Sequence, residues 1–215
     1  MKHITCYLDF VSPYAWLALE QMPKALQGLS YHVDYRPVLL GALLQGNANP
    51  GPAGIPAKRT WTYRHVTWLG RSLGIPLQMP ARHPFKPLPL LRLALAHGRD
   101  GSINRFVAQA VMQHVWQGGH EANDAQRLQQ LREQLKEQLK EQLRQEEDSA
   151  EVKQWLRSNT EQAQQAGVFG VPAWVVDGHV FWGLDGLPML QAYLRGDEWF
   201  AQQWEAAAGV PWGLE

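Results

Sequence analysis

The sequence has 215 residues and a mass of 24.4 kDa, enough for one large domain or for one domain with a sizeable insertion. Lys plus Arg number 20 and Asp plus Glu number 20, and this zero net charge argues against a nucleic-acid-binding protein. The sequence has no apolar run of the roughly 18 residues needed to span a membrane, and its start lacks the pattern of a secretory signal. We therefore expect a cytoplasmic protein without nucleic-acid or membrane partners.

Two residue types constrain the chemistry by their number. Cys6 is the single cysteine, so the chain can form no intramolecular disulfide and can carry out no dithiol redox reaction alone. The sequence also holds 10 Trp residues, which indicate either a Trp-rich core or an aromatic ligand pocket. The core is the favoured interpretation because large aromatic side chains are mostly buried packing.

The start of the chain predicts a strand, a helix and a second strand. Residues 3–10 alternate between apolar and polar side chains, which is typical of a strand. Ser12 and Pro13 then offer a hydroxyl N-cap and a proline in the first turn, so a helix is expected over 13–27. Residues 31–36 alternate again and predict the second strand.

The middle of the chain predicts helices. The segment 46–56 is rich in Gly and Pro and indicates a loop that could mark a domain junction. Helical periodicity follows over 57–74, 88–98 and 102–117. In 127–148 Leu recurs every four residues among Glu and basic residues, which favours one long, solvated helix with a single packed face. A coiled-coil seam is the alternative, but it would require a period of about 3.5 residues.

The end of the chain predicts a hairpin and a helix. Strand patterns over 173–177 and 179–183 flank an Asp-Gly turn signal, and a last helix is expected over 185–194. The layout β-α-β, helices, β-β-α is the thioredoxin-like topology of the α/β class with an inserted all-helical domain. We expect the thioredoxin-like domain to comprise 1–45 and 165–215 and the helical insertion to comprise 46–164.

Several reaction classes find no support in the sequence. Its 8 His residues form no HExxH motif and have no Cys partners, so no metal site is expected. The glycines of 46–56 lack the Lys and Ser/Thr of a phosphate-binding loop, and no GxSxG motif indicates a serine hydrolase.

Two local features could bind a ligand. Ser12, at the start of the first helix, is either an anion site or a plain helix cap, and position alone favours the cap. Pro172 begins a strand, and a cis Val171–Pro172 bond would expose the backbone of Val171 to a peptide-like ligand. Cis bonds are a minority even before proline, so the sequence leaves this open.

Four segments of the chain, in order, match the motifs of one family. They are DFVSPYAWLA at 9–18, RPVLLGALL at 36–44, GN at 46–47 and GVFGVPAWVVDGHVFWGLD at 167–185. In them the chain resembles the 2-hydroxychromene-2-carboxylate isomerases, which are relatives of kappa-class glutathione transferases and DsbA-type proteins. The resemblance implies a homodimer that uses glutathione. It also places Ser12 where redox relatives carry the first Cys of CxxC, so that Ser12 would hold the glutathione sulfur as a thiolate.

The resemblance assigns further residues to the two ends of glutathione. Asn47 and Lys58 match positions near the glycyl end, where Lys58 would pair with the carboxylate rather than serve only as a surface charge. Val171, before Pro172, would pair its backbone with the cysteinyl unit.

A turn would bind the γ-glutamyl end. Gly183, Leu184 and Asp185 match this turn, and Asp185 would meet the ammonium group, although a helix N-cap is its simpler role. Two departures concern the same turn: Leu184 stands where the family often has Asn, Gln or Ser, and Gly186 where it often has Arg. A contact at Leu184 would therefore use its backbone.

The implied reaction is the glutathione-dependent interconversion of 2-hydroxychromene-2-carboxylate and trans-o-hydroxybenzylidenepyruvate in aromatic-compound degradation. A thiolate adds to the conjugated substrate, a former double bond rotates, and the thiolate leaves, so glutathione is regenerated. One alternative is a kappa-like transferase or peroxidase acting on another electrophile. Another is a non-catalytic thioredoxin-fold binding module.

Overall fold

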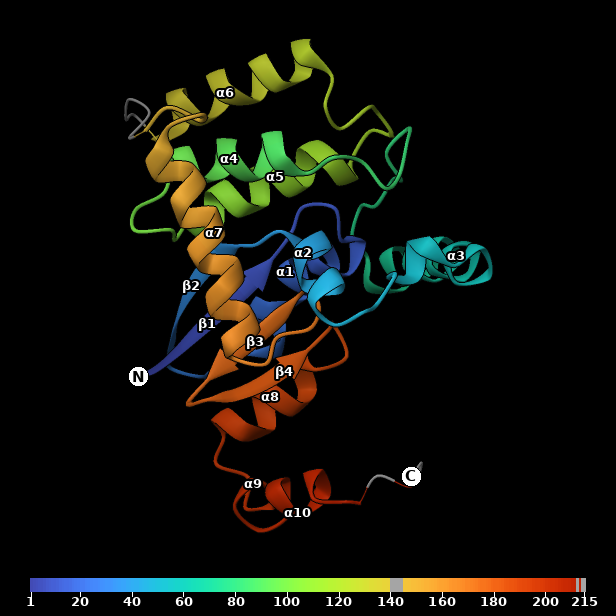
Figure 1. The fold of residues 1–215 in the computed structure, drawn as a ribbon, viewed down its shortest axis with the longest axis vertical. Coiled ribbons are helices and arrows are strands. Elements are labelled where there is room, and N and C mark those ends of the chain that lie inside the picture. Colours follow the sequence, from blue (N-terminus) through green and yellow to red (C-terminus); the bar gives the residue numbers. More distant parts are fainter. Residues whose placement is uncertain (140–144, 212, 214–215) are drawn as a thin grey trace.

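The computed structural model describes residues 1–139, 145–211 and 213. Its centre is a four-stranded sheet in the order β2-β1-β3-β4. The strands are β1 Lys2–Leu8, β2 Tyr31–Pro37, β3 Ala173–Val176 and β4 His179–Trp182. β1 runs parallel to β2 and antiparallel to β3, which pairs antiparallel with β4, so the two ends of the chain meet in one mixed sheet (Figure 1).

The helices lie between and after these strands. They are α1 Pro13–Ala25, α2 Leu40–Gly46, α3 Pro56–Leu73, α4 Leu88–Ala96, α5 Arg105–Trp116, α6 Ala125–Leu139, α7 Ala150–Gln165, α8 Leu187–Leu194, α9 Trp199–Gln202 and α10 Trp204–Ala208, with a 3-10 turn at Pro52–Gly54. In Figure 1, α4, α5 and α6 stack beyond one end of the sheet, and α3 projects sideways from the molecule.

The β-α-β start and the β-β-α end predicted from the sequence are confirmed. Helices α2 and α7 were not predicted, nor were the short helices α9 and α10 that follow the helix expected to be the last. α2 has 7 residues, of which Leu43 alone is buried, so it offers too few positions for a period. The helical middle is present, while the domain boundaries at 45/46 and 164/165 stay a prediction.

The single long helix expected over 127–148 is wrong in its last part. α6 ends at Leu139, 140–144 lie outside the described residues, and 145–149 form a turn. Glu147 folds back onto the Arg132 guanidinium at 2.5 and 2.9 Å, and Ser149 caps the next helix. The repeat of Leu and charged residues does not encode this turn, which an ion pair and a helix cap stabilise.

α7 escaped prediction because two of its buried positions are polar. Asn159 and Thr160 face inward and interrupt the apolar period. The Asn159 amide donates to the carbonyls of Pro37 and Gly101 at 3.0 and 2.8 Å, and the Thr160 hydroxyl accepts from the Leu39 amide at 3.1 Å. These bonds join α7 to the end of β2 and satisfy side chains that would otherwise be costly to bury.

Some of the Trp residues are buried in the core and others are exposed to solvent. Trp16, Trp116 and Trp174 are fully buried, which confirms the core interpretation for these three. Trp61 and Trp68 on α3 are instead 65% and 61% exposed. Helix α3 thus carries aromatic rings on the side that faces solvent.

Among the described residues, no helix combines the length and the apolar character needed to cross a membrane.

Candidate functional site

Ser12 immediately precedes α1 and lies against the segment that leads into β3 from the other part of the chain. Its hydroxyl oxygen accepts from the Ala15 amide at 3.2 Å, so it is the N-cap of α1. The same hydroxyl donates to the Val171 carbonyl at 3.2 Å. Ser12 is 6% exposed, and its single proton is therefore held by a backbone carbonyl at the helix terminus. The Ser12 hydroxyl is therefore both the helix cap and the central group of the candidate site.

The backbone that presents Ser12 is held at each residue. The Asp9 carboxylate accepts from the Val11 amide at 3.1 Å and from the Leu40 amide at 2.9 Å, and the Ser12 amide donates to the Asp9 carbonyl at 3.1 Å. The Phe10 carbonyl accepts from the Trp116 indole at 3.0 Å. Segment 9–12 is therefore fixed from α2 on one side and from α5 on the other, as a preorganised site requires.

His83 adds another anchor to the same segment. Its Nε2 lies 2.8 Å from the Val11 carbonyl, and the Tyr63 hydroxyl lies 2.9 Å from its Nδ1. The ring must donate through Nε2 because a carbonyl can only accept. Burial lowers the pKa of His83, which favours the neutral ring, and the Tyr63 hydroxyl beside Nδ1 donates to the His83 backbone carbonyl at 2.7 Å.

The Val171–Pro172 peptide bond is cis. Among the described residues, the Val171 amide hydrogen has no protein acceptor, although Val171 is only 8% exposed. The Pro172 carbonyl accepts from the Gly183 amide at 2.9 Å, which ties this segment to the turn after β4. A free backbone donor next to Ser12 fits a ligand with a peptide group.

Tyr14 connects α1, α3 and the turn after β4. Its hydroxyl lies 2.9 Å from Nδ1 of His65 on α3. Burial and the negative charge of Asp185 both raise the pKa of Tyr14. Asp185 is thus close enough to α1 to act on a residue two positions after Ser12.

The turn at 183–185 has a defined shape. Gly183 has φ +85°, in the left-handed region that favours glycine, and the Asp185 carboxylate lies close beside its Cα. Gly186 is the N-cap residue of α8 and no side chain caps this helix, so the Asp185 carboxylate is exposed and not used as a cap. Leu184 is partly buried against the core, which leaves its backbone for any ligand contact.

Asn47 and Lys58 lie further along the chain from this cluster. Asn47 ends α2, and its amide donates to the Leu43 carbonyl at 2.8 Å. Lys58 lies exposed in the first turn of α3 and forms no ion pair with any carboxylate of the described residues. The structure brings Ser12, Val171 and Pro172 together, but no interaction among the described residues joins Asn47 or Lys58 to Ser12.

Sequence reasoning did not identify the groups that support Ser12. Asp9 and Tyr14 lie inside the DFVSPY motif but were given no role. His65 and His83 are spread over helical and Pro-rich segments without metal or catalytic spacing. Only the tertiary contacts show that these side chains converge on the start of α1.

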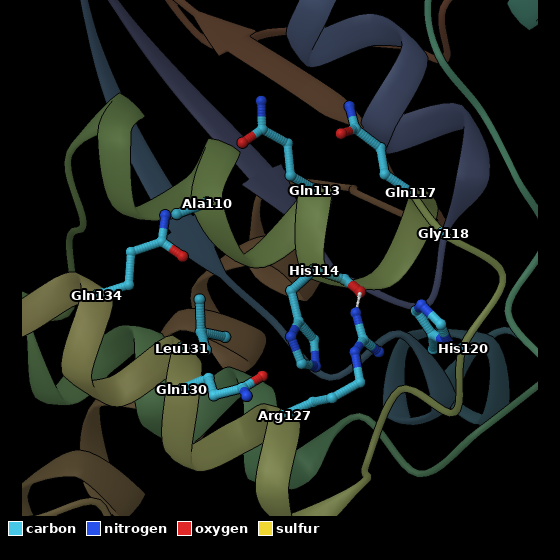
Figure 2. A pocket seen from close by; sticks show the side chains of 10 residues that line it. All are labelled: Ala110, Gln113, His114, Gln117, Gly118, His120, Arg127, Gln130, Leu131 and Gln134. Carbon is cyan, nitrogen blue, oxygen red and sulfur yellow. Dashed lines mark hydrogen bonds between the residues drawn. The ribbon is translucent and has the colours of Figure 1, made fainter.

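A cavity of about 450 Å³ lies elsewhere, between α5 and α6. Figure 2 shows its polar lining of glutamines, histidines and one arginine, with Arg127 donating to the His114 carbonyl at 2.7 Å. None of the predicted site residues lines it. We therefore place the candidate active site at Ser12, on the grounds of its chemistry, and not in this cavity.

The fold and the site define a known class. The model of the DSBA-like thioredoxin domain matches residues 3–195, so the chain belongs to that family. The thioredoxin-like fold with inserted helices, expected from the sequence, is confirmed.

The chain is similar in sequence to isomerases and to glutathione transferases. A 2-hydroxychromene-2-carboxylate isomerase of Sphingobium xenophagum is 29% identical over 196 residues, covering 90% of this chain and 98% of its own. A kappa 2 glutathione S-transferase of Caenorhabditis elegans is 25% identical over 207 residues, covering 90% and 92%. A solved structure of a 2-hydroxychromene-2-carboxylate isomerase superposes with a TM-score of 0.70 at 21% identity, covering 90% of this chain and 94% of that one. These similarities confirm the resemblance found in the sequence motifs.

We expect the Tyr14→Phe variant to lose about 1 kcal/mol of unfolding free energy, because it deletes the hydroxyl that joins α1 to His65. Urea unfolding would measure this loss. Tyr31→Phe is the matched control, because no described residue hydrogen-bonds the Tyr31 hydroxyl. Equal stability of the two variants would show that the Tyr14–His65 contact does not stabilise the protein.

Proposed function

We propose that the protein is a glutathione-dependent isomerase that interconverts 2-hydroxychromene-2-carboxylate and trans-o-hydroxybenzylidenepyruvate. One observation carries the proposal: a buried Ser12 hydroxyl caps α1 and contacts the carbonyl before a cis proline. A serine there cannot form a disulfide, and Cys6 is buried in the core. An α-helix N-terminus and a hydroxyl donor both stabilise an anion, as a bound thiolate requires.

The residues of this chain would each hold one part of glutathione. Glutathione would supply the thiolate nucleophile, which the Ser12 hydroxyl would meet after rotating away from the Val171 carbonyl. The free Val171 amide would bind the cysteinyl unit. The exposed Asp185 carboxylate suits the γ-glutamyl ammonium, and the exposed Lys58 ammonium suits the glycyl carboxylate.

The remaining residues assigned to the site would position glutathione. Asn47 would contact the glycyl end from the end of α2, and Pro172, Gly183 and Leu184 would shape the backbone along the ligand. We further propose that the protein acts on a small aromatic carboxylate, in the cytoplasm, as a homodimer.

A glutathione transferase acting on another electrophile is the second candidate. It is supported by the similar identity of the chain to a named isomerase, 29%, and to a named kappa transferase, 25%. The site near Ser12 suits both reactions, since each begins with a bound thiolate. The fate of glutathione separates them, because an isomerase returns it and a transferase consumes it.

Calorimetric titration with glutathione, with thiolate absorbance followed on the same samples, tests the cofactor. We expect binding, and we expect Lys58→Met to weaken it about tenfold or more, because a charge-assisted bond contributes roughly 1.5–3 kcal/mol. Lys24→Met is the matched control, since Lys24 is an exposed lysine in the last turn of α1, far along the helix from Ser12.

The outcomes separate the candidates. Turnover of the chromene carboxylate with constant total glutathione supports the isomerase. Loss of one glutathione per product formed from an electrophile supports the transferase. Absence of glutathione binding to the wild-type protein contradicts both and favours a non-catalytic binding module.

A further inference from the structure

Two imidazoles and a carboxylate gather at the start of the parallel strand pair. His3 on β1 lies directly opposite His32 on β2 in the strand register. Asp34 is two residues further along β2, and residues two apart in a strand share one face of the sheet. The ligand atoms of the three side chains all lie within 4.8 Å of one another. The register, and not the spacing in the sequence, brings them together.

The three groups are placed for a common ligand. The His3 and His32 ring centroids are 5.0 Å apart, and His32 Nε2 lies 3.3 Å from Asp34 Oδ1. Bonds of about 2.0–2.2 Å to a tetrahedral ion would require ligand atoms about 3.4 Å apart. The His32 and Asp34 side chains are 51% and 38% exposed, so rotation of the side chains can close the remaining gap while the strands stay in place.

The nearest cationic side chains on β1 and β2 bind other residues and not Asp34. Lys2 precedes His3 and therefore points to the opposite face, where its ammonium pairs with Asp177. Arg36 follows Asp34 on the same face of β2, and its guanidinium donates to Asn159 Oδ1 at 3.1 Å. Neither cation is paired with the Asp34 carboxylate, which leaves its charge for a bound ion or for His32.

We propose that His3, His32 and Asp34 form a binding site for a divalent transition metal ion, Zn²⁺ in the first instance. Imidazole nitrogen and carboxylate oxygen are ligands that Zn²⁺ accepts, and water would complete its coordination. The site lies at the opposite end of β1 from Ser12, about 20 Å away for a strand of this length. Its role would therefore be to join β1 to the edge strand β2 and not to take part in catalysis, so the proposal does not depend on the proposed function.

Calorimetric titration of ZnCl₂ into the tag-free full chain tests the proposal. We expect one Zn²⁺ per chain, and at least about a tenfold weaker affinity in His32→Ala and in Asp34→Asn. His179→Ala is the matched control, because His179 is a histidine on another edge strand, β4, with no place in this cluster. Its affinity should equal that of the wild type.

Thermal unfolding gives a second, independent measurement. A ligand that binds only the folded state raises the unfolding temperature, so Zn²⁺ should stabilise the wild type and His179→Ala but not His32→Ala. Circular dichroism in the absence of metal would verify that the variants fold, because His32 is exposed and Asp34 and His179 are only partly buried. Equal Zn²⁺ affinity of His32→Ala and the wild type, or no binding at all, would overturn the proposal.

Discussion

The Ser12→Ala variant should lose about 10–100-fold in turnover at neutral pH while it still binds glutathione. The hydroxyl is the proposed donor to the thiolate, and a hydrogen bond to a charged group contributes roughly 1.5–3 kcal/mol. Since about 1.4 kcal/mol corresponds to one pKa unit, the pKa of the bound thiol should rise by about 1–2 units. Thiolate absorbance against pH would record that rise, and steady-state kinetics would record the loss of turnover.

A control must separate this effect from the loss of a helix cap. Ser12 caps α1 by accepting from the Ala15 amide at 3.2 Å, and Ser149 caps α7 by accepting from the Val152 amide at 3.2 Å. Both Ala variants should therefore lose about 1 kcal/mol of unfolding free energy. Ser149→Ala should keep full turnover. If Ser12→Ala kept full turnover as well, the role proposed for the Ser12 hydroxyl would be wrong.

The Asp9→Asn variant should remove a pH dependence of stability that spans about pH 4 to 7. Asp9 is fully buried, and burial raises the pKa of its carboxyl from 3.8 to about 7 despite the amide donors of Leu40, Val11 and Phe10, which lower it. Between these two pH values the folded state keeps the Asp9 proton and the unfolded state has lost it. Asp9 therefore stabilises the fold fully below about pH 4, and this contribution is lost as the pH rises towards 7.

The expected size follows from the same shift. At about 1.4 kcal/mol per pKa unit, a shift from 3.8 to about 7 corresponds to roughly 4–5 kcal/mol in full, most of which falls between pH 4 and 7.5. The unfolding free energy of the wild type, relative to Asp9→Asn, should fall by that order between pH 4 and 7.5. Denaturant unfolding at a series of pH values would measure the difference. The comparison with the variant matters because other carboxyl groups titrate in the same range.

Asp177→Asn is the control, because the pKa of the Asp177 carboxyl is shifted in the opposite direction to that of Asp9. The hydrogen bond from Lys2 lowers the pKa of the exposed Asp177 carboxyl, so its contribution is lost only as the pH falls through values below 3.8. The curve of Asp177→Asn should therefore run parallel to that of the wild type between pH 4.5 and 7.5. If the curve of Asp9→Asn also ran parallel, Asp9 would titrate in the folded protein as it does in the unfolded chain.

Local sequence patterns determined most of the regular structure. Alternation placed β1 and β2, and the hydroxyl and proline at Ser12 and Pro13 placed the start of α1. These signals succeed because they depend on neighbours in the chain. They fail for α7, where the bonds from the Asn159 amide and from the Leu39 amide to Thr160 each span more than 50 residues of chain, although Thr160 also donates to the Leu156 carbonyl of its own helix.

For the candidate site as well, the sequence predicts the local features and the tertiary structure supplies the long-range contacts. The sequence by itself determined that this chain has no dithiol, that Ser12 heads a helix, and that Val171 precedes a proline at a strand start. The tertiary structure decided that the Ser12 hydroxyl meets the Val171 carbonyl, that Asp9, His83 and Trp116 hold segment 9–12, and that His3 faces His32. Each of these contacts joins residues that the chain order separates, so only strand register and packing can specify them.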